Sequence, residues 1–401
     1  MLPNLMTNLL SDIRILDLTN VLAGPFCCHQ LVHFGAEVIK IEPPERGDLA
    51  RQLGADTELN SKNMGVSFLA QNAGKKSVTL NLKDPRGRSL FLELVKTADV
   101  VVENFRPGVM NRLDLSWDTL KNTNQNLVYC AISGFGQDGP WAEKPAYDQI
   151  VQGLSGVMAI TGDKASAPLR VGYPIGDTIG GLTAAMAICA ALNKKKATLI
   201  DVSMLESVLV TTGWVISNWL IAGEQPLPHG NENPTSAPSG TFQAGDRLLN
   251  IAANKEEQWR TLALHIDRED LLKHPDYSSR DARKRHRKAL KFEIESAIKN
   301  RKAAELADEL TSLGVPAGVV MTIPDILKEP VISARGLLAD FQDVPGVGRD
   351  IQTVRTGVKV NSEAPAVESP PPQLGAHNAE VLGKLGIDDL LLKELSENGV
   401  I

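Results

Sequence analysis

Short apolar runs recur along the first half of the chain, and segments with helical patterning separate most of them. Runs of this length, bounded by turn residues, are typical of strands buried inside a sheet. Because strands alternate with helices, the pattern predicts an α/β domain with a parallel sheet. The predicted strands are Ile13–Leu18, Ala36–Glu42, Ser77–Leu82, Asp99–Phe105, Leu127–Ser133 and Ala197–Met204.

Two helix starts carry recognisable sequence signals. Pro25 follows the loop TNVLAG and suits a first helical position, because the N–H that proline lacks would be unpaired there. Asp84 and Pro85 predict the cap and the first residue of the helix after the third strand. Such helices supply the crossovers that parallel strands need.

Two later segments are apolar enough to raise the question of a membrane. Ile179–Leu192 is too short to cross a bilayer, and Ser207–Gly223 contains several polar residues. We therefore predict two buried helices and no membrane association. The N-terminal residues lack the basic and apolar regions of a signal peptide, so a cytoplasmic location is expected.

The sequence changes in character after Gly223. A stretch rich in proline, glycine, asparagine and serine predicts a linker or long loop. A strand hairpin and a helix are expected next, over residues 241–259, and a highly charged helical segment follows. From Ile323 onward the pattern indicates further strands and terminal helices.

Composition narrows the function classes. The chain has 401 residues and a net charge of −6, which argues against a general nucleic-acid binder. It has four cysteines and no CxxC pair, so no zinc framework is predicted, and so few cysteines suit a reducing cytosol.

The loop TNVLAG, residues 19–24, is the first candidate for a ligand-binding loop. It joins a predicted strand to a helix N-terminus, where backbone N–H groups favour anions. It is neither GxGxxG nor GxxxxGK[ST], which disfavours a dinucleotide-dependent dehydrogenase and a P-loop nucleotidase. As a group, cations after the strand ends suit a ligand with several phosphates. They are Lys40, Arg46, Arg51, Lys75, Lys76, Arg106 and Arg112.

Asp177 lies in the stretch VGYPIGDTIGG, directly before an apolar helix. One interpretation is a helix cap, because aspartate accepts N–H bonds at helix starts. The other is covalent catalysis, in which the carboxylate attacks an activated acyl group. On this reading the glycines leave room for a substrate, and the helix N-terminus keeps the carboxylate ionised. The two roles are compatible.

Several segments together resemble CoA-transferase family III, the CaiB/BaiF family. They extend over nearly the whole chain, in the order of the family. These segments are IRILDLTNVLAGPFCCHQLVHFGAEVIKIEPPERGDLAR, GKKSVTLNLKDPRGR, DVVVENFRPGVMNRL, SGFGQDGPWAEKPAYDQIVQGLSG, VGYPIGDTIGG, IDVSMLESV and PQLGAHNAEVLGKLG.

The resemblance implies a fold and an assembly. The expected fold is an α/β large domain with a Rossmann-like parallel sheet, built from both chain ends, plus a smaller α+β domain. The expected bounds are 1–224 for the first part of the large domain, 225–325 for the small domain, and 326–401 for a segment that returns to the large domain. Two chains are expected to interlock as a homodimer.

The resemblance also implies site residues. Asp177 matches the family's catalytic aspartate, which carries acyl and then CoA. Coenzyme A or acyl-CoA enters as a substrate, and no metal or redox cofactor is required. The positions that match CoA contacts are Val21, Leu22, Ala23, Lys75, Asn104, Phe105 and Arg112. Pro43 replaces a CoA-contacting arginine of formyl-CoA transferases, so Arg46 is expected to take over that contact.

The racemase branch of the family is the first alternative to CoA transfer. Racemases of the family use a histidine where this chain has Tyr147, and phenols are poor proton acceptors at neutral pH. Tyr147 is expected to hydrogen-bond an acyl or carboxylate oxygen, with a buried structural tyrosine as the other interpretation. Asp148 is a second candidate polar site residue. Backbone N–H groups near the glycines, at Gly176 above all, are candidate oxyanion donors.

The substrates are only partly indicated. The glycine-rich loop of formyl-CoA transferases is not evident, which puts formyl-CoA and oxalate specificity in doubt. We expect succinyl-CoA as donor and a short dicarboxylate such as itaconate, malate, mesaconate or glutarate as acceptor. A CoA-binding protein without activity is the second alternative, although the presence of Asp177 counts against it.

Overall fold

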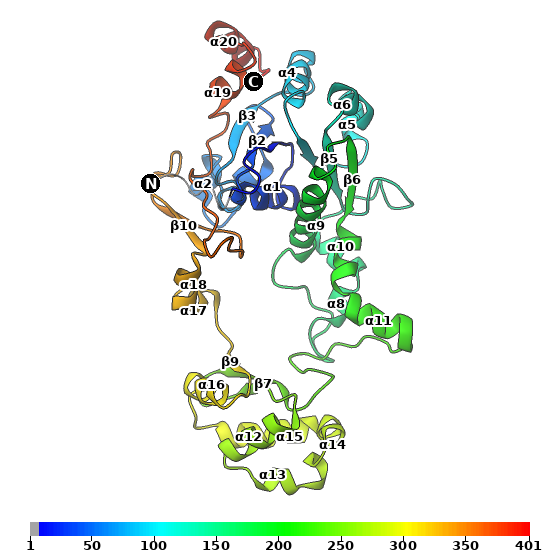
Figure 1. Ribbon diagram of the computed structural model, residues 1–401, viewed down its shortest axis with the longest axis vertical. Helices are drawn as coiled ribbons and strands as arrows, with labels where there is room; N and C mark the ends of the chain where they lie inside the picture. The colour runs from blue at the N-terminus through cyan, green and yellow to red at the C-terminus, as the bar shows by residue number, and fades with distance from the viewer. Residues whose placement is uncertain (1–7) are drawn as a thin grey trace. The chain divides into compact units, whose positions relative to one another are not determined.

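The computed structural model describes residues 8–401 (Figure 1). Contacts divide this part of the chain into two compact units. The large unit takes residues up to Val157, Arg170–Gly223 and Pro330–Ile401, and the small unit takes Met158–Leu169 and Glu224–Glu329. The predicted division had placed 158–169 in the large domain and the second boundary after residue 325.

The large unit is built on a six-stranded sheet in which every pairing is parallel. Its order is β3-β2-β1-β4-β5-β6, which is the doubly wound order of Rossmann-type sheets. Each predicted strand of the first half is present, a few residues shorter. The strands are β1 (Arg14–Asp17), β2 (Glu37–Glu42), β3 (Lys76–Thr79), β4 (Val100–Glu103), β5 (Val128–Ser133) and β6 (Thr198–Ser203).

Helices cover both faces of this sheet because its strands are apolar on both sides. Val100 and Val102 of β4 belong to one core cluster and Val101 to the other. The first cluster contains residues of α1 (Ala23–His33), α7 (Asp148–Leu154), α9 (Ile175–Leu192) and α10 (Met204–Thr211). The second contains residues of α4 (Pro85–Val95), α5 (Val109–Arg112), α6 (Trp117–Thr123), α19 (Asn378–Gly383) and α20 (Asp389–Glu397).

The C-terminal segment belongs to the large unit but adds no strand to the parallel sheet in the described residues. It supplies α19 and α20 and a separate antiparallel pair, β10 (Leu338–Phe341) and β11 (Ile351–Val354). The large unit is thus built from both chain ends, whereas its parallel sheet is built from residues 14–203 alone.

The small unit contains a three-stranded antiparallel sheet and a helical layer with its own core. The predicted hairpin followed by a helix is present. Its elements are β7 (Ser239–Gln243), β8 (Leu248–Ala252), α12 (Glu256–His265), α13 (Asp270–Lys273), η2 (Pro275–Tyr277), α14 (Arg280–Arg285), α15 (Arg287–Ile298), α16 (Ala303–Ser312), β9 (Ala317–Val319) and α17 (Ile323–Ile326). Further short helices are η1 (Leu49–Gln52), α2 (Thr57–Ser61), α3 (Val66–Leu69), α8 (Val157–Ile160) and α18 (Pro330–Arg335).

The prediction that residues 207–223 form a buried helix is wrong. Residues 207–223 lie in two helices, α10 and α11 (Gly213–Ala222), bent by 72° at their junction. None of the residues of α11 is buried, and Trp214 and Ile221 are 79% and 85% exposed. By length and composition alone, α9 and the bent pair could each cross a membrane. In this structure α9 packs against α1, α7, α10 and the sheet.

Candidate active site

The sheet has its topological switch point between β1 and β4, and ligands of doubly wound sheets bind at that point, beyond the carboxyl ends of the strands. A cavity of about 540 Å³ opens at this edge. It includes the predicted residue Phe105 and also Pro43, the residue that replaces the arginine of formyl-CoA transferases. Its lining comes from the end of β2 and from the segments after β1, β2, β3 and β4: Leu18, Asn20, Ile41–Glu45, Leu80–Lys83, Phe105, Val109 and Leu113, with Gly399.

The predicted CoA loop lies beside this cavity. Helix α1 begins at Ala23, two residues before the predicted start at Pro25, so Val21 and Leu22 form the turn that leads into it. Val21 has a φ of +67°. This left-handed conformation is a genuine outlier for a β-branched residue, and such strain is concentrated at functional sites.

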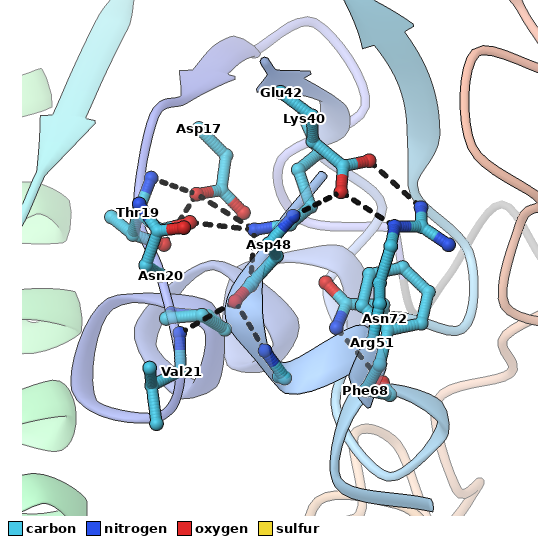
Figure 2. Close-up of polar contacts among 12 residues, drawn as sticks. Asp17, Thr19, Asn20, Val21, Lys40, Glu42, Asp48, Arg51, Phe68 and Asn72 are labelled. Atoms are coloured by element: carbon cyan, nitrogen blue, oxygen red, sulfur yellow. Dashed lines mark hydrogen bonds and ion pairs between the residues drawn. The ribbon is translucent and has the colours of Figure 1, made fainter. Parts of the chain in front are cut away.

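Buried charges lie beneath the loop (Figure 2). The side chains of Asp17, Lys40 and Asp48 have no exposed surface in their ion pairs, and Lys40 Nζ lies 3.0 Å from Asp48 Oδ2. Burial raises the pKa of Asp17, but Lys40 and Lys75 outweigh it and hold that pKa well below its usual range. Burial lowers the pKa of Lys40, and Asp17 and Asp48 reverse this effect.

Three of the seven predicted phosphate-binding cations, Lys40, Arg51 and Lys75, are buried. Lys75 Nζ donates to Asp17 Oδ2 at 2.9 Å and to the Pro25 carbonyl at 3.0 Å, and Arg51 pairs with Glu42. With Lys40, these buried ammonium and guanidinium groups are neutralised by carboxylates, so here they face the protein rather than a ligand. Sequence patterning does not separate such inward charges from outward ones.

The other predicted CoA contacts take different positions. Asn104 holds the loop: its Oδ1 accepts from Asn20 N–H, and its Nδ2 donates to the Asn20 carbonyl, each at 2.8 Å. Arg46 and Arg112 are exposed. Arg112 lines a second hollow, of about 790 Å³, together with the loop after β5. Contacts of these residues with CoA stay predictions.

Asp177 is the third residue of α9, not its cap. Pro174 holds the cap position, and the helix start has no side-chain cap hydrogen bond. The interpretation of Asp177 as a structural cap is therefore wrong. Its carboxylate is partly buried and accepts no hydrogen bond from any residue of the described chain.

Burial, together with the negative charge of Asp148, raises the pKa of Asp177 to about 7. This overrides the expected effect of the helix N-terminus, which alone would keep the carboxylate ionised. A carboxylate with raised basicity and no hydrogen-bond donor is a stronger nucleophile than an ordinary surface aspartate.

Asp148 is buried at the start of α7 and holds the turn before Asp177. Its Oδ1 accepts from Gly176 N–H at 2.8 Å, and its Oδ2 accepts from Gln152 Nε2 at 2.7 Å. Gly176 N–H is thus engaged and has no hydrogen to offer an oxyanion in this conformation. Asp148 acts on Asp177 through charge and through the backbone of this turn.

Glycines let α9 approach its neighbours closely. A Cβ on Gly181 would lie 2.5 Å from the Ala23 carbonyl oxygen, and a Cβ on Gly176 would meet Val151 and Asp148. Asp177 precedes Gly181 by four residues, so both lie on one face of α9. The face that carries the candidate nucleophile is therefore the face against the start of α1, where the predicted CoA loop ends.

Tyr147 is 72% exposed directly before α7. The interpretation as a buried structural tyrosine is therefore wrong. In the described chain its phenol oxygen has no hydrogen-bond partner, so its contact with an acyl or carboxylate oxygen stays a prediction.

Glu103 is a buried carboxyl that the sequence reasoning did not single out. It ends β4, and its Oε2 accepts from Phe105 N–H at 2.7 Å while its Oε1 accepts from Tyr129 O–H at 3.0 Å. Burial raises its pKa to about 7, and these hydrogen bonds only partly oppose that effect. The sequence feature that could have indicated this residue is a glutamate at the end of an otherwise apolar strand.

No cluster of metal-ligating side chains occurs within residues 8–401.

Comparison with known proteins agrees with this geometry. The sequence model of CoA-transferase family III matches residues 10–378. Succinate–glutarate CoA-transferase of Agrobacterium fabrum is 34% identical, over 94% of this chain and 95% of its own. Succinyl-CoA:mesaconate CoA-transferase of Haloarcula hispanica is 35% identical, over 94% and 96%. The crystal structure of a CaiB/BaiF family protein from Brucella suis superposes with a TM-score of 0.82 at 32% identity, over 93% of this chain and 98% of that one.

The parallel sheet with its cavity at the switch point, the unpaired carboxylate of Asp177 on the face of α9 that carries Gly181, and these relatives over almost the whole chain lead to one assignment. The chain belongs to CoA-transferase family III and is a CoA-transferase.

Proposed function

We propose that the enzyme transfers CoA from succinyl-CoA to a short dicarboxylate, with Asp177 as the covalent carrier. The substrate classes rest on the two relatives above, which are named for succinate or succinyl-CoA together with glutarate or mesaconate. The observation that carries the catalytic role is the partly buried, unpaired carboxylate of Asp177, whose pKa is raised to about 7.

The proposed reaction has four balanced steps. The Asp177 carboxylate attacks the donor acyl carbon and expels CoA thiolate, which forms a mixed anhydride. The thiolate attacks the aspartyl carbonyl of this anhydride, which gives an aspartyl-CoA thioester and frees succinate. The acceptor carboxylate attacks the thioester and expels CoA thiolate again. The thiolate finally attacks the acceptor acyl carbon of the second anhydride and restores Asp177.

Two features of the site support these steps. The raised pKa makes the Asp177 carboxylate more basic, and its lack of a hydrogen-bond donor leaves both oxygens available to the donor thioester. Asp177 shares a face of α9 with Gly181, and that face meets the start of α1. The nucleophile is therefore on the face of α9 turned toward the loop of residues 19–24, where CoA is proposed to bind. Proximity of this kind is a large part of the catalytic effect in acyl transfer.

An acceptor screen tests the proposed substrates. The enzyme is incubated with succinyl-CoA and each of glutarate, mesaconate, itaconate, malate, oxalate and formate, and new thioesters are identified by mass spectrometry. We expect transfer to at least one dicarboxylate of four or five carbons, and little to formate. Transfer to formate alone, or to none of the dicarboxylates, would contradict the proposal. In the same assay Asp177→Asn should lose transfer activity, because an amide cannot act as the carboxylate nucleophile. Asp118→Asn, which changes an exposed first-turn carboxylate of α6, is the matched control and should keep it.

We also propose that the active assembly is an interlocked homodimer. Monomeric proteins seldom expose large apolar patches, yet α9, α10 and α11 carry a series of exposed apolar side chains. These are Leu182, Met186, Val210, Trp214, Trp219, Leu220 and Ile221. A second copy of the chain is the proposed cover, as the resemblance to the family implies.

A further inference from the structure

The backbone of residues 19–21 is held by side chains at almost every polar group. Thr19 N–H donates to Asp17 Oδ1 at 2.9 Å, and the Thr19 carbonyl accepts from Lys40 Nζ at 2.7 Å. Val21 N–H donates to Asp48 Oδ1 at 2.9 Å. Figure 2 shows the contacts of Asp17, Lys40 and Asp48 with this segment. Together with the double hydrogen bond between Asn20 and Asn104, they form what we call the loop clamp.

The loop clamp comes from elements that are distant in sequence. Asp17 ends β1, Lys40 lies in β2, Asp48 caps η1, and Asn104 follows β4. Lys40 connects them, because its ammonium contacts the Thr19 carbonyl and also lies 3.0 Å from Asp48. Each clamp side chain is fixed by rigid strands or by other buried contacts, so the loop has little freedom to relax.

Val21 is the residue that needs such a clamp. A valine with a φ of +67° is strained, because its branched Cβ crowds the backbone there. Strained backbone persists only where surrounding contacts over-determine it. The contact that reaches Val21 directly is the hydrogen bond from its N–H to Asp48, and Asn104 fixes the residue before it. Glycine would adopt this conformation without strain.

Close packing fixes the other side of the loop. A Cβ on Gly24 would lie 2.2 Å from Thr19 Cγ2, so the loop folds back tightly onto the first turn of α1. A Cβ on Gly181 would lie 2.5 Å from the Ala23 carbonyl, so that same turn sits against α9. Val21 therefore lies in a loop that borders the switch-point cavity through Asn20 and leads into the turn packed against α9.

We propose that Asp48, Lys40 and Asn104 are positioning residues that hold Val21 in its strained conformation and so keep the loop in the form that binds CoA. This inference rests on the proposed function. A loop that is ordered before the ligand arrives does not lose conformational entropy on binding, so preorganisation strengthens affinity. The clamp should therefore act on the affinity for CoA and acyl-CoA, and not on the affinity for the acceptor acid.

The test is a double-mutant cycle between Asp48 and Val21. Asp48→Ala removes the acceptor for Val21 N–H, and Val21→Gly removes the strain. We expect Asp48→Ala to raise the Kd for CoA, measured by calorimetry with CoA alone, and the KM for succinyl-CoA about tenfold. The KM for the acceptor and kcat at saturation should change less than twofold. In the Val21→Gly background the same substitution should change the Kd less than threefold.

Two further variants keep the test decisive if Asp48→Ala does not fold. Asp48→Asn retains an oxygen for Val21 N–H but loses the charge that faces Lys40, and Asn104→Ala releases Asn20 at a less buried position. Both should raise the Kd for CoA, and Val21→Gly should restore it in part. Glu37→Gln is the matched control, because Glu37 lies at the other end of β2 and pairs with Arg14 and Lys76. It should leave the Kd unchanged.

The outcomes separate this inference from the proposed function. If the wild-type protein binds CoA and the clamp variants bind it equally well, the proposed positioning role of the loop clamp is wrong and the proposed function stands. A loss of affinity that is equal with and without the Val21→Gly substitution would also contradict the clamp. If the wild-type protein binds no CoA, both proposals fail.

Discussion

At Asp177, two environments act in opposite directions on one carboxylate. The first turn of a helix favours negative charge, whereas burial and the neighbouring Asp148 disfavour it and raise the pKa to about 7. The sequence indicated a nucleophile or a cap at this position, because both need a carboxylate near a helix start. It could not exclude the cap, since that depended on whether the helix begins at residue 175 or later.

The raised pKa makes a prediction about stability. The folded pKa of about 7 lies above the ordinary value of 3.8, so the unfolded chain loses this proton first as pH rises. Wild-type stability should therefore fall between about pH 4 and pH 7 relative to Asp177→Asn, and the difference should stay constant above that range. Thermal melts of both proteins from pH 4 to pH 8 measure this. A difference in Tm that does not depend on pH would contradict the shift.

Among elements, the strands were the best predicted part. Each of the six predicted strands of the first half is a strand of one parallel sheet, because a strand buried on both faces reads as a short, nearly continuous apolar run. The roles of charged residues at the strand ends were harder to predict. Lys40 and Lys75 were predicted to bind phosphate, but they are buried against Asp17 and Asp48. Strand periodicity does not show which carboxylates come together from separate strands, so the loop clamp had no signal within one segment.

The contact between α1 and α9 makes a second prediction. In Gly181→Ala the new Cβ would lie 2.5 Å from the Ala23 carbonyl oxygen, a backbone atom that cannot move cheaply. We expect a loss of about 1–3 kcal/mol in the free energy of unfolding, as overpacking typically costs. The transfer rate should also fall at least tenfold, because Asp177 would move away from the loop.

Gly383→Ala is the matched control for this prediction. A Cβ at Gly383, the last residue of α19, would meet no atom within 4 Å. Chemical denaturation and steady-state kinetics of both variants provide the comparison. If Gly181→Ala unfolds and turns over like Gly383→Ala, the close approach of the two helices is not required.

For the whole molecule, the exposed apolar side chains of α9, α10 and α11 are the feature that one chain does not account for. The sequence indicated two apolar helices and, through the family resemblance, a dimer. It placed α11 inside the fold, because apolar composition does not distinguish a core from an interface. The division into two units was expected. No local sequence pattern indicated, however, that residues 158–169 belong to the small unit.

The proposed dimer makes a third prediction. Sedimentation of the wild-type protein at micromolar concentration should show a dimer and no folded monomer. Ile221→Lys should weaken this assembly and lower activity, since Ile221 is 85% exposed on α11. Leu390→Lys, at an 81% exposed leucine of α20, is the control and should remain dimeric. A wild-type monomer that is stable and active would overturn the proposal.

The central claim is that Asp177 carries CoA covalently, and trapping the intermediate tests it most directly. Wild-type enzyme is incubated with succinyl-CoA without an acceptor, reduced with borohydride and digested for peptide mapping. We predict that the aspartyl thioester accumulates and that the reduced residue maps to position 177. Asp177→Asn should form no adduct, and its transfer activity should be lower by orders of magnitude. Unmodified Asp177 in an active wild-type enzyme, or near-normal transfer by Asp177→Asn, would contradict the account.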